Sequence, residues 1–485
     1  MDAAEREAKE EGDIGLKCSK KNFSSWYNEV VLKADLVDFS KVKGFMFIKP
    51  YGYGIWERIR AALDGRLKAK GHVNAYAPAV IPEKLLNREK EHVEGFAPEG
   101  FYVTETGSGK LAERLILRPT SETIIYPSYA KWVRSWRDLP VLWNYWNSVF
   151  RAEIKMTKLF LRTCEFLWQE GHTVHATEKE AIEEAMDIAG IYKDLMEKEL
   201  AIPVIVGRKS DKEKFAGAVE TLTLEAIMPD GRALQMGTTH NLGQNFSKAF
   251  GITYLDKKQK RRHAWQTSWG VSTRLIGATV MVHGDDKGLV LPPNVAPVQA
   301  VIVPIIYEKS KSAVLKKAKE LFDELDGGFR VKLDEREGYT AGWKFNEWEL
   351  KGVPVRLEIG PKDVEKKQVV LVRRDTGGKI TVKENGVEKA LSLLLEKMQK
   401  DMFRKADGFL KANITEAGSY AELKRQVNDR KMALAGWCGD QACEDRIQDE
   451  TSATIRVIPF GKKAGGRCVC CGKKAKEKVY IGKGY

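Results

Sequence analysis

The sequence predicts three folded parts: an α+β part, then an α/β part, then a small cysteine-bearing tail. A chain of 485 residues has room for about three domains of roughly 150 residues, and its 43% hydrophobic content can fill separate cores. Pro292, Pro293 and Pro297 lie between two apolar runs, a composition typical of an extended connector. Cysteines crowd into the last part. We therefore expect domains over residues 1–292, 298–400 and 405–485.

The first part alternates amphipathic helices with strand-like runs. The stretch from Tyr53 to Lys70 has a helical pattern. The runs Val141 to Ile154 and Phe160 to Trp168 are rich in β-branched and aromatic residues. A short polar loop separates these two runs, so we expect an antiparallel hairpin.

After the connector, strand patterns alternate with helical patterns, beginning with AVIVPII and SAVLKKAKELFDEL. This order predicts a compact α/β domain with a largely parallel sheet. A helical pattern from Val387 to Ala412 then leads into the tail.

The net charge of +14 favours a polyanionic partner, because lysines and arginines that neutralise phosphates release condensed counterions. Charge alone does not name that partner. The stretch MDAAEREAKEEGDIG lacks an apolar segment after a basic start, and no run approaches the roughly 18 apolar residues of a membrane span. We expect a cytoplasmic protein with no membrane partner.

Charged residues occupy unexpected places in the predicted hairpin. Strand alternation puts Arg151 and Glu153 on one face of the first run. In the second run, it puts Arg162 on the same strand face as Trp168. Arginine offers planar, bidentate donors that match a phosphate, so the hairpin can form an anion cradle. The alternative is a solvated sheet face with ordinary cross-strand pairs.

Four separated segments, taken in order, resemble a known family. They are LILRPTSETIIYPSYAKW, the hairpin with Arg151, LQMGTTHNLGQNF and WQTSWGVSTRLIGATVMVHGDDKGLVLPP. Together they closely resemble prolyl-tRNA synthetase of the archaeal and eukaryotic type, through nearly the whole chain. The resemblance implies a class II synthetase fold, with a mainly antiparallel sheet in its α+β catalytic domain. Class II motif 1 would be the stretch from Gly52 to Pro78, motif 2 the hairpin, and motif 3 the strand and helix around Arg274.

The resemblance implies activation of L-proline with ATP and Mg²⁺, then transfer of proline to the 3' end of tRNA(Pro) with release of AMP and pyrophosphate. Arg151 would hold the α-phosphate where the proline carboxylate attacks, and Arg274 would hold the γ-phosphate. Glu153 would orient the adenine or a metal ion. Such a displacement needs mainly alignment and charge stabilisation from the protein. Without the other motifs, Arg274 could equally be interpreted as an arginine in a surface loop, near the cap of a helix. Further ATP-contacting positions are Arg162, Thr163, Gln235, Thr238 and Ser272.

The family's proline-contacting positions match Thr120, Glu122 and His240. Glu122 would be the counter-ion of the proline amine, Thr120 would share that amine, and His240 would lie near the carboxylate or the ring. Arg151 belongs to this set too, because it aligns the phosphate with the attacking carboxylate. Trp168 would wall the ring, although a tryptophan there equally fits the core.

The segment GTTH poses a question of register. Strict alternation places Thr238 and His240 on one strand face and Gln235 on the other. A β-bulge supplied by Gly237 would bring all three to one face. Regular strand pairing through Gly237 would contradict this hypothesis.

Residues 171–269 contain helices and the strand-forming VETLTLEAI and RALQMG, but no domain-length insertion. Bacterial-type prolyl enzymes carry an editing domain in that interval, so we expect none in this chain. An apolar pocket discriminates poorly among near-isosteres, so some mischarging with alanine or cysteine should occur.

The tail has the cysteine spacing of a zinc site. Cys438 and Cys443 are separated by four residues, and Cys468 and Cys471 by two. Four thiolates leave no open coordination position, so a structural Zn²⁺ would help to fold the tail. Cys470 is surplus, and a free-thiol cluster without metal is the alternative.

The resemblance also implies that residues 298–400 read the anticodon of the tRNA, that motif 1 forms a homodimer, and that Tyr485 approaches the catalytic domain. Two alternatives stay open. One is a class II relative that charges threonine, histidine or glycine, although RPTSE and GTTH favour proline. The other is a catalytically silent RNA- or regulator-binding paralogue. The presence of four residues with catalytic roles in the family argues against it: Glu122, Arg151, Arg162 and Arg274.

Overall fold

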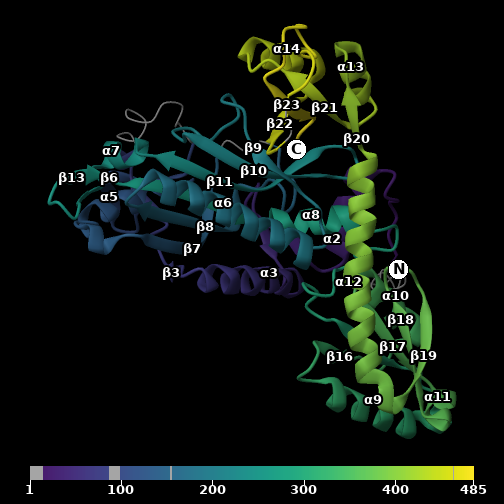
Figure 1. Ribbon diagram of the computed structural model, residues 1–485. Helices are drawn as coiled ribbons and strands as arrows, with labels where there is room; N and C mark the ends of the chain where they lie inside the picture. Colours follow the sequence, from purple (N-terminus) through teal and green to yellow (C-terminus); the bar gives the residue numbers. More distant parts are fainter. Residues whose placement is uncertain (1–14, 87–98, 153–155, 462–463) are drawn as a thin grey trace.

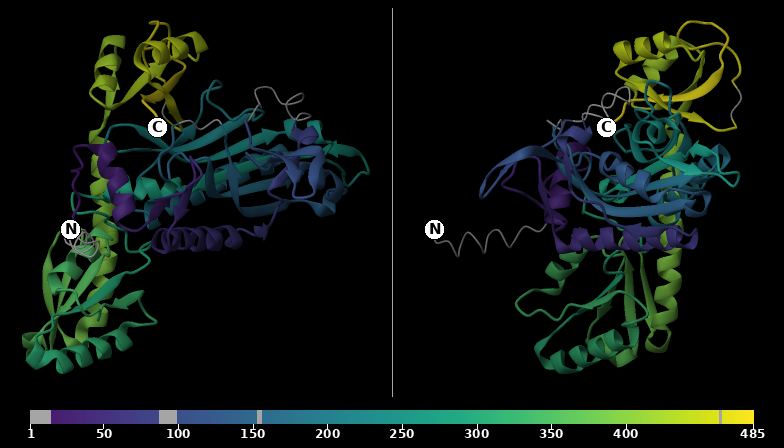
Figure 2. Two further views of the ribbon diagram at one scale, coloured as in Figure 1. Left: turned by 180° about the vertical axis from the view of Figure 1, so that it is seen from behind. Right: turned by 90° about the vertical axis from the view of Figure 1, so that its left-hand side faces the viewer.

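The computed structural model describes residues 15–86, 99–152, 156–461 and 464–485. A long helix, α12 (Val387–Ala412), runs along one side of the molecule. Figure 2 shows an α/β part at one end of this helix and the C-terminal part at the other, with a broad sheet between them. None of the helices in these described ranges is both long and apolar enough to cross a membrane.

The elements of the first part follow the predicted alternation. In chain order they are α2 (Phe23–Lys33), β1 (Val37–Phe39), β2 (Met46–Ile48), α3 (Pro50–Ala69), β3 (Val73–Ala75), β4 (Val80–Pro82), β5 (Tyr102–Thr106), β6 (Gly109–Leu117), α5 (Glu122–Trp132), β7 (Val141–Phe150), β8 (Glu165–His175), α6 (Glu178–Asp194), β9 (Ile205–Arg208), β10 (Glu220–Ile227), β11 (Ala233–Gly243), α7 (Asn245–Phe250), β12 (Thr253–Leu255), β13 (Arg261–His263), β14 (Trp265–Ser272) and α8 (Arg274–His283). The predicted helix from Tyr53 to Lys70 is α3.

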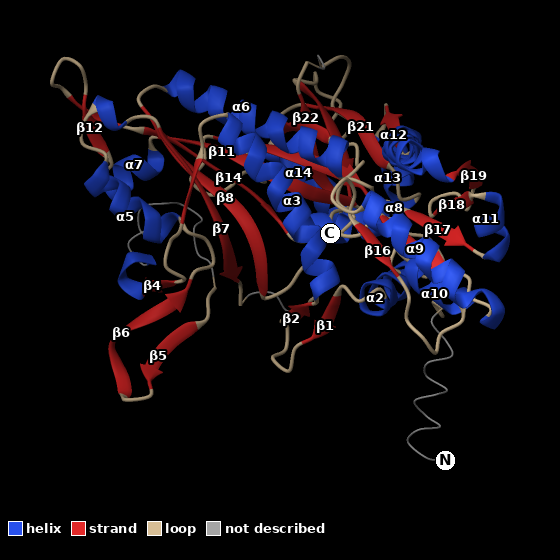
Figure 3. Ribbon diagram, turned by 90° about the horizontal axis from the view of Figure 1, so that it is seen from below, coloured by secondary structure: helices blue, strands red, loops and turns tan. Residues whose placement is uncertain are grey.

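Seven of these strands form one sheet in the order β9-β10-β11-β14-β8-β7-β3. All pairs from β9 to β7 are antiparallel, and only the edge strand β3 runs parallel to its neighbour. The mainly antiparallel sheet is therefore confirmed. A smaller sheet, β4-β6-β5, extends away from it (Figure 3).

Helix α6 covers one face of the large sheet. It begins with a capping box, in which Thr177 and Glu180 each bond the other's backbone N–H. Its apolar side packs on β11 and β14, and the hydroxyl of Thr239 donates to the carbonyl of Ala185 at 2.9 Å. Because successive strand residues point to opposite faces, the neighbours of Thr239 face away from α6.

The predicted connector holds no helix or strand between residues 284 and 299. The α/β part after it has a five-stranded sheet in the order β16-β15-β17-β18-β19. Its elements are β15 (Ala300–Pro304), α9 (Lys311–Leu325), β16 (Val331–Leu333), α10 (Ala341–Leu350), β17 (Val355–Ile359), α11 (Pro361–Lys366), β18 (Gln368–Arg373) and β19 (Lys379–Lys383).

The expectation of a largely parallel sheet was wrong in detail, because this sheet is mixed. Strands β16, β15 and β17 are parallel, whereas β17–β18 and β18–β19 are antiparallel. A parallel pair needs a crossover of about a dozen residues or more. The connections at residues 360–367 and 374–378 are too short for that.

Helix α12 has the predicted bounds and leads into β20 (Ile414–Ala417), α13 (Tyr420–Asn428), β21 (Met432–Trp437), α14 (Gln441–Thr451), β22 (Thr454–Pro459) and β23 (Glu477–Gly482). Strand β22 pairs with β9, so the C-terminal strands extend the catalytic sheet. Gly207 permits this junction, because a Cβ there would lie 2.3 Å from the carbonyl oxygen of Ile458.

Candidate active site

A cavity of about 490 Å³ opens on the face of the large sheet opposite α6. Strands β8, β10, β11 and β14 form its floor, and the N-terminus of α5 borders it. Seven residues predicted from the sequence line it together: Thr120, Glu122, Arg151, Trp168, Gln235, Thr238 and His240.

A β-bulge brings the β11 residues to this face. Leu224 pairs with Gly237 and Glu225 pairs with Gln235, so Met236 is the extra residue in β11. The predicted bulge is present, one residue earlier than Gly237. As a result, Gln235 lines the cavity together with Thr238 and His240.

The motif 2 hairpin is antiparallel, as predicted, but its loop is longer. Strand pairing runs from Val141–Val174 to Phe150–Glu165, and the described residues 151, 152 and 156–164 lie outside this ladder. The first strand ends before Ile154 and the second starts after Phe160, so the alternation argument that placed Arg162 beside Trp168 was wrong. Within the loop the backbones of Lys158 and Arg162 bond each other at 2.7 and 2.8 Å, which replaces the expected ladder. Glu153 lies outside the described residues.

The predicted phosphate-binding arginines form a positive group at one end of the site. Arg274 is the first residue of α8, and its Nη1 donates to the carbonyl of Gln235 at 3.2 Å. Burial, followed by the charge of Arg151, lowers the pKa of Arg274 to about 10, and the charge of Arg162 acts in the same direction. Arg151 donates from Nε to the carbonyl of Pro119 at 3.4 Å. Three arginines close enough to oppose each other's charge suit a polyphosphate.

Four of the predicted ATP residues are not among those that line the cavity: Arg162, Thr163, Ser272 and Arg274. The hydroxyl of Thr163 donates to the carbonyl of Glu165 at 2.6 Å. The hydroxyl of Ser272 accepts the backbone N–H of Arg274 at 3.2 Å. These two side chains hold the backbone at the start of β8 and at the start of α8.

The opposite end of the cavity is acidic and buried. Glu122 is the first residue of α5 and is 3% exposed, and the hydroxyl of Thr120 donates to its Oε2. Glu170, which is 2% exposed, accepts a hydrogen bond from Asn147 at 2.8 Å. Its other oxygen lies 3.0 Å from Nε2 of His172. A cation is the natural ligand for two carboxylates held out of water.

The pKa values of two histidines at this end are shifted in opposite directions. Burial opposes a charge on His172, but the hydrogen bond to Glu170 and the charges of Glu170 and Glu122 raise the pKa of His172 overall. Burial, then the charge of His172, lowers the pKa of His240 to about 3. His240 is therefore a neutral imidazole that can hydrogen-bond but offers no positive charge.

Aromatic rings give the cavity an apolar wall. The ring of Phe215 lies 4.6 Å from that of His240. Trp168 lines the cavity together with Gly270 on the neighbouring strand. Trp168 therefore lies at the cavity, and its contact with a proline ring stays a prediction.

Several lining residues were not predicted, including Glu170, His172, Phe215 and Ser268. A signal for two of them was present in the sequence. Alternation along β8 from Trp168 places Glu170 and His172 on the same face. Phe215 lies between β9 and β10, where no periodic pattern indicates the site.

The chain reaches back to the catalytic part at Tyr485. The N–H of Ala233 donates to the carbonyl of Lys483 at 2.8 Å, and the Tyr485 hydroxyl donates to Asp230 at 2.7 Å. Ala233 is two residues ahead of Gln235 in β11. This segment therefore supports the strand that carries part of the site.

The four predicted cysteines form a cluster whose sulfur atoms all lie within 4.8 Å of one another: Cys438, Cys443, Cys468 and Cys471. The Sγ of Cys438 is 3.6 Å from that of Cys443 and 3.7 Å from that of Cys471. A tetrahedral zinc with bonds of about 2.3 Å requires sulfurs about 3.8 Å apart. The donor set fits zinc, and the surplus Cys470 packs against the core of the tail.

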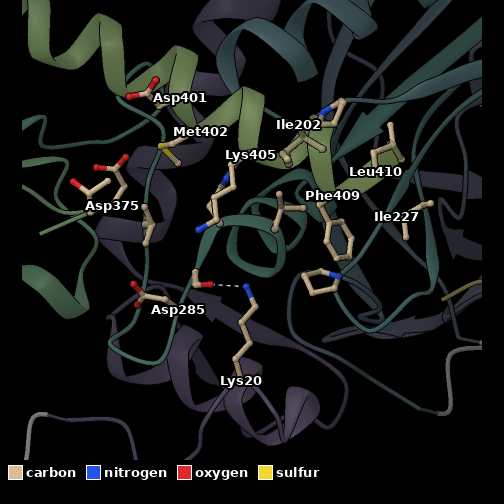
Figure 4. Close-up of a pocket in the computed structure, with 18 residues that line it drawn as sticks. Lys20, Ile202, Ile227, Asp285, Asp375, Asp401, Met402, Lys405, Phe409 and Leu410 are labelled. Carbon is tan, nitrogen blue, oxygen red and sulfur yellow. Dashed lines mark hydrogen bonds between the residues drawn. The ribbon is translucent and has the colours of Figure 1, made fainter. Parts of the chain in front are cut away.

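A second cavity, of about 340 Å³, lies between α12 and the C-terminal end of α8 (Figure 4). Phe409 and Leu410 give it an apolar side. The Nζ of Lys20 donates to the carbonyl of Gly284 at 2.5 Å, and burial, then the charge of Lys405, lowers the pKa of Lys20 to about 8. It shares no lining residue with the first cavity.

The antiparallel sheet, with an arginine group at one end of its cavity, defines the core of a class II aminoacyl-tRNA synthetase. Three family models match the chain in order. They are the tRNA synthetase class II core domain (G, H, P, S and T) over residues 102–283, the anticodon binding domain over 299–394, and the prolyl-tRNA synthetase C-terminal domain over 420–485.

Relatives of known name extend the match to most of the chain. The proline–tRNA ligase of Natranaerobius thermophilus is 56% identical over 452 residues, which cover 93% of each chain. That of Alkaliphilus oremlandii is 53% identical over 466 residues, 96% of each chain. That of Cenarchaeum symbiosum is 51% identical over 475 residues, 97% of this chain and 100% of the relative. The chain belongs to the proline–tRNA ligase family of class II aminoacyl-tRNA synthetases.

Proposed function

We propose that the enzyme activates L-proline with ATP to form prolyl-adenylate, and then transfers proline to the 3' end of tRNA(Pro). The observation that carries this proposal is the polarity of the cavity. Two buried carboxylates and Arg151 line it, and Arg274 and Arg162 lie close enough to Arg151 to form a group of positive charge with it. A proline ammonium fits the carboxylates and a triphosphate the arginines.

At the acidic end, Glu122 is the counter-ion of the proline ammonium, and Thr120 shares that amine. Its hydrogen bond to Glu122 supports this role, because it holds the carboxylate in place. His240, kept neutral by its low pKa, contacts the carboxylate or the ring by hydrogen bonding or packing. The rings of Trp168 and Phe215 supply the apolar wall.

At the cationic end, Arg151 holds the α-phosphate and Arg274 the γ-phosphate. ATP binds with Mg²⁺, which the class uses as a counter-ion for the phosphates. Gln235 and Thr238 line the floor beneath the nucleotide, whereas Thr163 and Ser272 support it through the backbone. Arg162 adds positive charge from the hairpin loop, and Glu153 acts on the adenine or a metal ion.

The chemistry follows from alignment. A carboxylate oxygen of proline attacks the α-phosphorus, the bond to the bridging oxygen breaks, and pyrophosphate leaves. A ribose hydroxyl of the terminal tRNA nucleotide then attacks the adenylate carbonyl, and AMP leaves. Fixed arginines stabilise the charge on the phosphorus in the first step without becoming covalently involved.

We propose the domain division 1–292, 298–400 and 405–485, with the second domain reading the anticodon and the third holding a structural Zn²⁺. The last boundary falls near the C-terminal end of α12. We also propose that the enzyme lacks an editing domain of its own. Residues 171–269 support this, since most of them belong to the catalytic sheet and the helices that pack on it. Purified enzyme that hydrolyses alanyl-tRNA(Pro) would contradict it.

A homodimer around motif 1 is part of the same proposal. Large apolar side chains are exposed on both sides of α3 in the sequence: Phe39, Val42 and Phe47 before it, and Val73 and Tyr76 after it. Exposed apolar residues in such numbers are typical of an interface.

The test is ATP–pyrophosphate exchange across a panel of amino acids. Proline should support exchange, and threonine, histidine and glycine should not. A different preferred amino acid would assign another substrate to the pocket. Absence of exchange with any amino acid would favour the RNA- or regulator-binding alternative.

A further inference from the structure

We propose that Arg456, in the C-terminal strand β22, is a positioning residue for ATP: it fixes Glu225, which in turn sets the positions of Gln235 and Arg274. The inference rests on the proposed function. It concerns a residue far along the chain from the three class II motifs.

Glu225 is an acid in the floor of the sheet with no exposure to solvent. Arg456 holds both of its carboxylate oxygens, with Nη2 at 3.1 and 2.9 Å. The Nζ of Lys209 lies 2.8 Å from Oε1. Burial opposes the charge, but these two cations lower the pKa of Glu225 overall. The hydroxyl of Thr223 also donates to Oε1 at 3.1 Å. Glu225 is therefore a buried anion held by two cations and one hydroxyl.

Glu225 is directly linked to the ATP end of the cavity. It is the cross-strand partner of Gln235, at the position of the β-bulge. The carbonyl of Gln235 accepts the Nη1 of Arg274. The charge of Glu225 also acts on Arg274, where it opposes the effect of burial on the pKa.

This arrangement makes Arg456 and Arg274 competitors for one carboxylate. With Arg456 in place, Glu225 has a bidentate partner and Arg274 keeps its guanidinium available for phosphate. Without Arg456, the buried charge of Glu225 is compensated by Lys209 alone. Arg274 is then drawn toward it, and the backbone of Gln235 moves at the bulge.

The fold makes specific room for Arg456. Its side chain is 12% exposed, and Gly484 covers it, since a Cβ on Gly484 would lie 2.6 Å from its Nη1. The C-terminal part thus places one enclosed cation against Glu225, the cross-strand partner of Gln235.

A second ion pair at the same junction provides a matched control. Arg208 in β9 pairs with Glu477 in β23, with side-chain exposures of 38% and 32%. It ties the C-terminal part to β9, which lies between β22 and β10 in the sheet, but neither residue lines the cavity or contacts Gln235. A general loss of docking should therefore affect Arg208 and Arg456 variants alike.

The experiment measures proline-dependent ATP–pyrophosphate exchange for full-length wild type, Arg456→Gln, Arg456→Lys and Arg208→Gln, with ATP and proline varied separately. Arg456→Gln should raise the KM for ATP about tenfold and leave the KM for proline within about twofold. Arg456→Lys should raise it less, because lysine restores the charge but not the bidentate geometry. Arg208→Gln should match wild type.

Equal kinetics for the Gln variants of Arg456 and Arg208 would overturn the inference, as would a parallel rise in both KM values. If Arg456→Gln does not fold, Arg456→Lys decides: an unchanged KM for ATP in that variant contradicts the proposal. Absence of proline-dependent exchange in wild type would instead refute the proposed function.

Discussion

The Nδ1 atom of His240 lies 2.9 Å from the hydroxyl oxygen of Thr221, its direct partner across the β10–β11 ladder. This contact, together with the tilted ring of Phe215 at 4.6 Å, holds a neutral imidazole in the wall of the cavity. On the proposed function, the carboxylates at the acidic end therefore recognise the proline ammonium. Glu122 is one of these carboxylates.

Glu122→Gln should weaken proline use without affecting ATP. The substitution keeps the size and the bond to Thr120 but removes the charge that pairs with the ammonium. We expect kcat/KM for proline in pyrophosphate exchange to fall by roughly 10- to 100-fold, with an unchanged KM for ATP. Glu220→Gln, in β10 but not lining the cavity, serves as control. A rise in the KM for ATP alone would contradict the assignment of Glu122 to the proline subsite.

His283 should make the fold sensitive to acid. Burial lowers the pKa of His283 to about 4, and its Nε2 lies 2.8 Å from the carbonyl of Leu200. The unfolded chain takes up this proton near pH 6.5 and the folded chain only near pH 4, so this stability is present above pH 6.5 and is lost as pH falls toward 4.

Between pH 7 and pH 5, wild type should therefore lose about 2 kcal/mol more stability than His283→Gln, in which the amide can replace the donor. Chemical unfolding at the two pH values measures the difference. Identical pH dependence in the two proteins would show that His283 is not kept neutral.

The zinc content of the protein should depend on four of the five clustered cysteines and not on Cys470. Purified wild type and Cys470→Ser should each contain about one zinc per chain. Cys438→Ser should lose it, because three thiolates and a hydroxyl hold the ion poorly. Elemental analysis before and after chelation measures the content. Loss of zinc from Cys470→Ser alone would reassign the ligands, and its absence from wild type would favour free thiols.

The exposed residues beside α3 should control the oligomeric state. Phe47, 63% exposed, and Tyr76, 75% exposed, are replaced together by glutamate. Light scattering should show a dimer for wild type and a monomer for the double variant, since buried charges destabilise an interface. Tyr307→Glu, at a residue 64% exposed beyond β15, should remain a dimer. A monomeric wild type would refute the proposed dimer.

Local patterns predicted the regular elements well. Helices α3 and α12 follow the 3.6-residue periodicity of their segments, and the β7–β8 hairpin follows the enrichment in β-branched and aromatic residues. The prediction for Arg162 failed because the backbone of its segment forms hydrogen bonds outside the β7–β8 strand ladder. The loop around Arg162 bonds to itself, so strand alternation did not apply there.

The sequence by itself determined the class of enzyme, the order of the domains, the zinc-type cysteine spacing and seven of the 17 residues that line the cavity. These depend on residue type and on spacing along the chain. Tertiary structure alone decided three features: the position of the Glu170 carboxylate in the cavity, the neutral state of His240, and the link from Arg456 through Glu225 to Gln235. The reason is physical: a pKa, a buried ion pair and the register at a bulge depend on which distant groups share a low-dielectric space, and chain position does not record this.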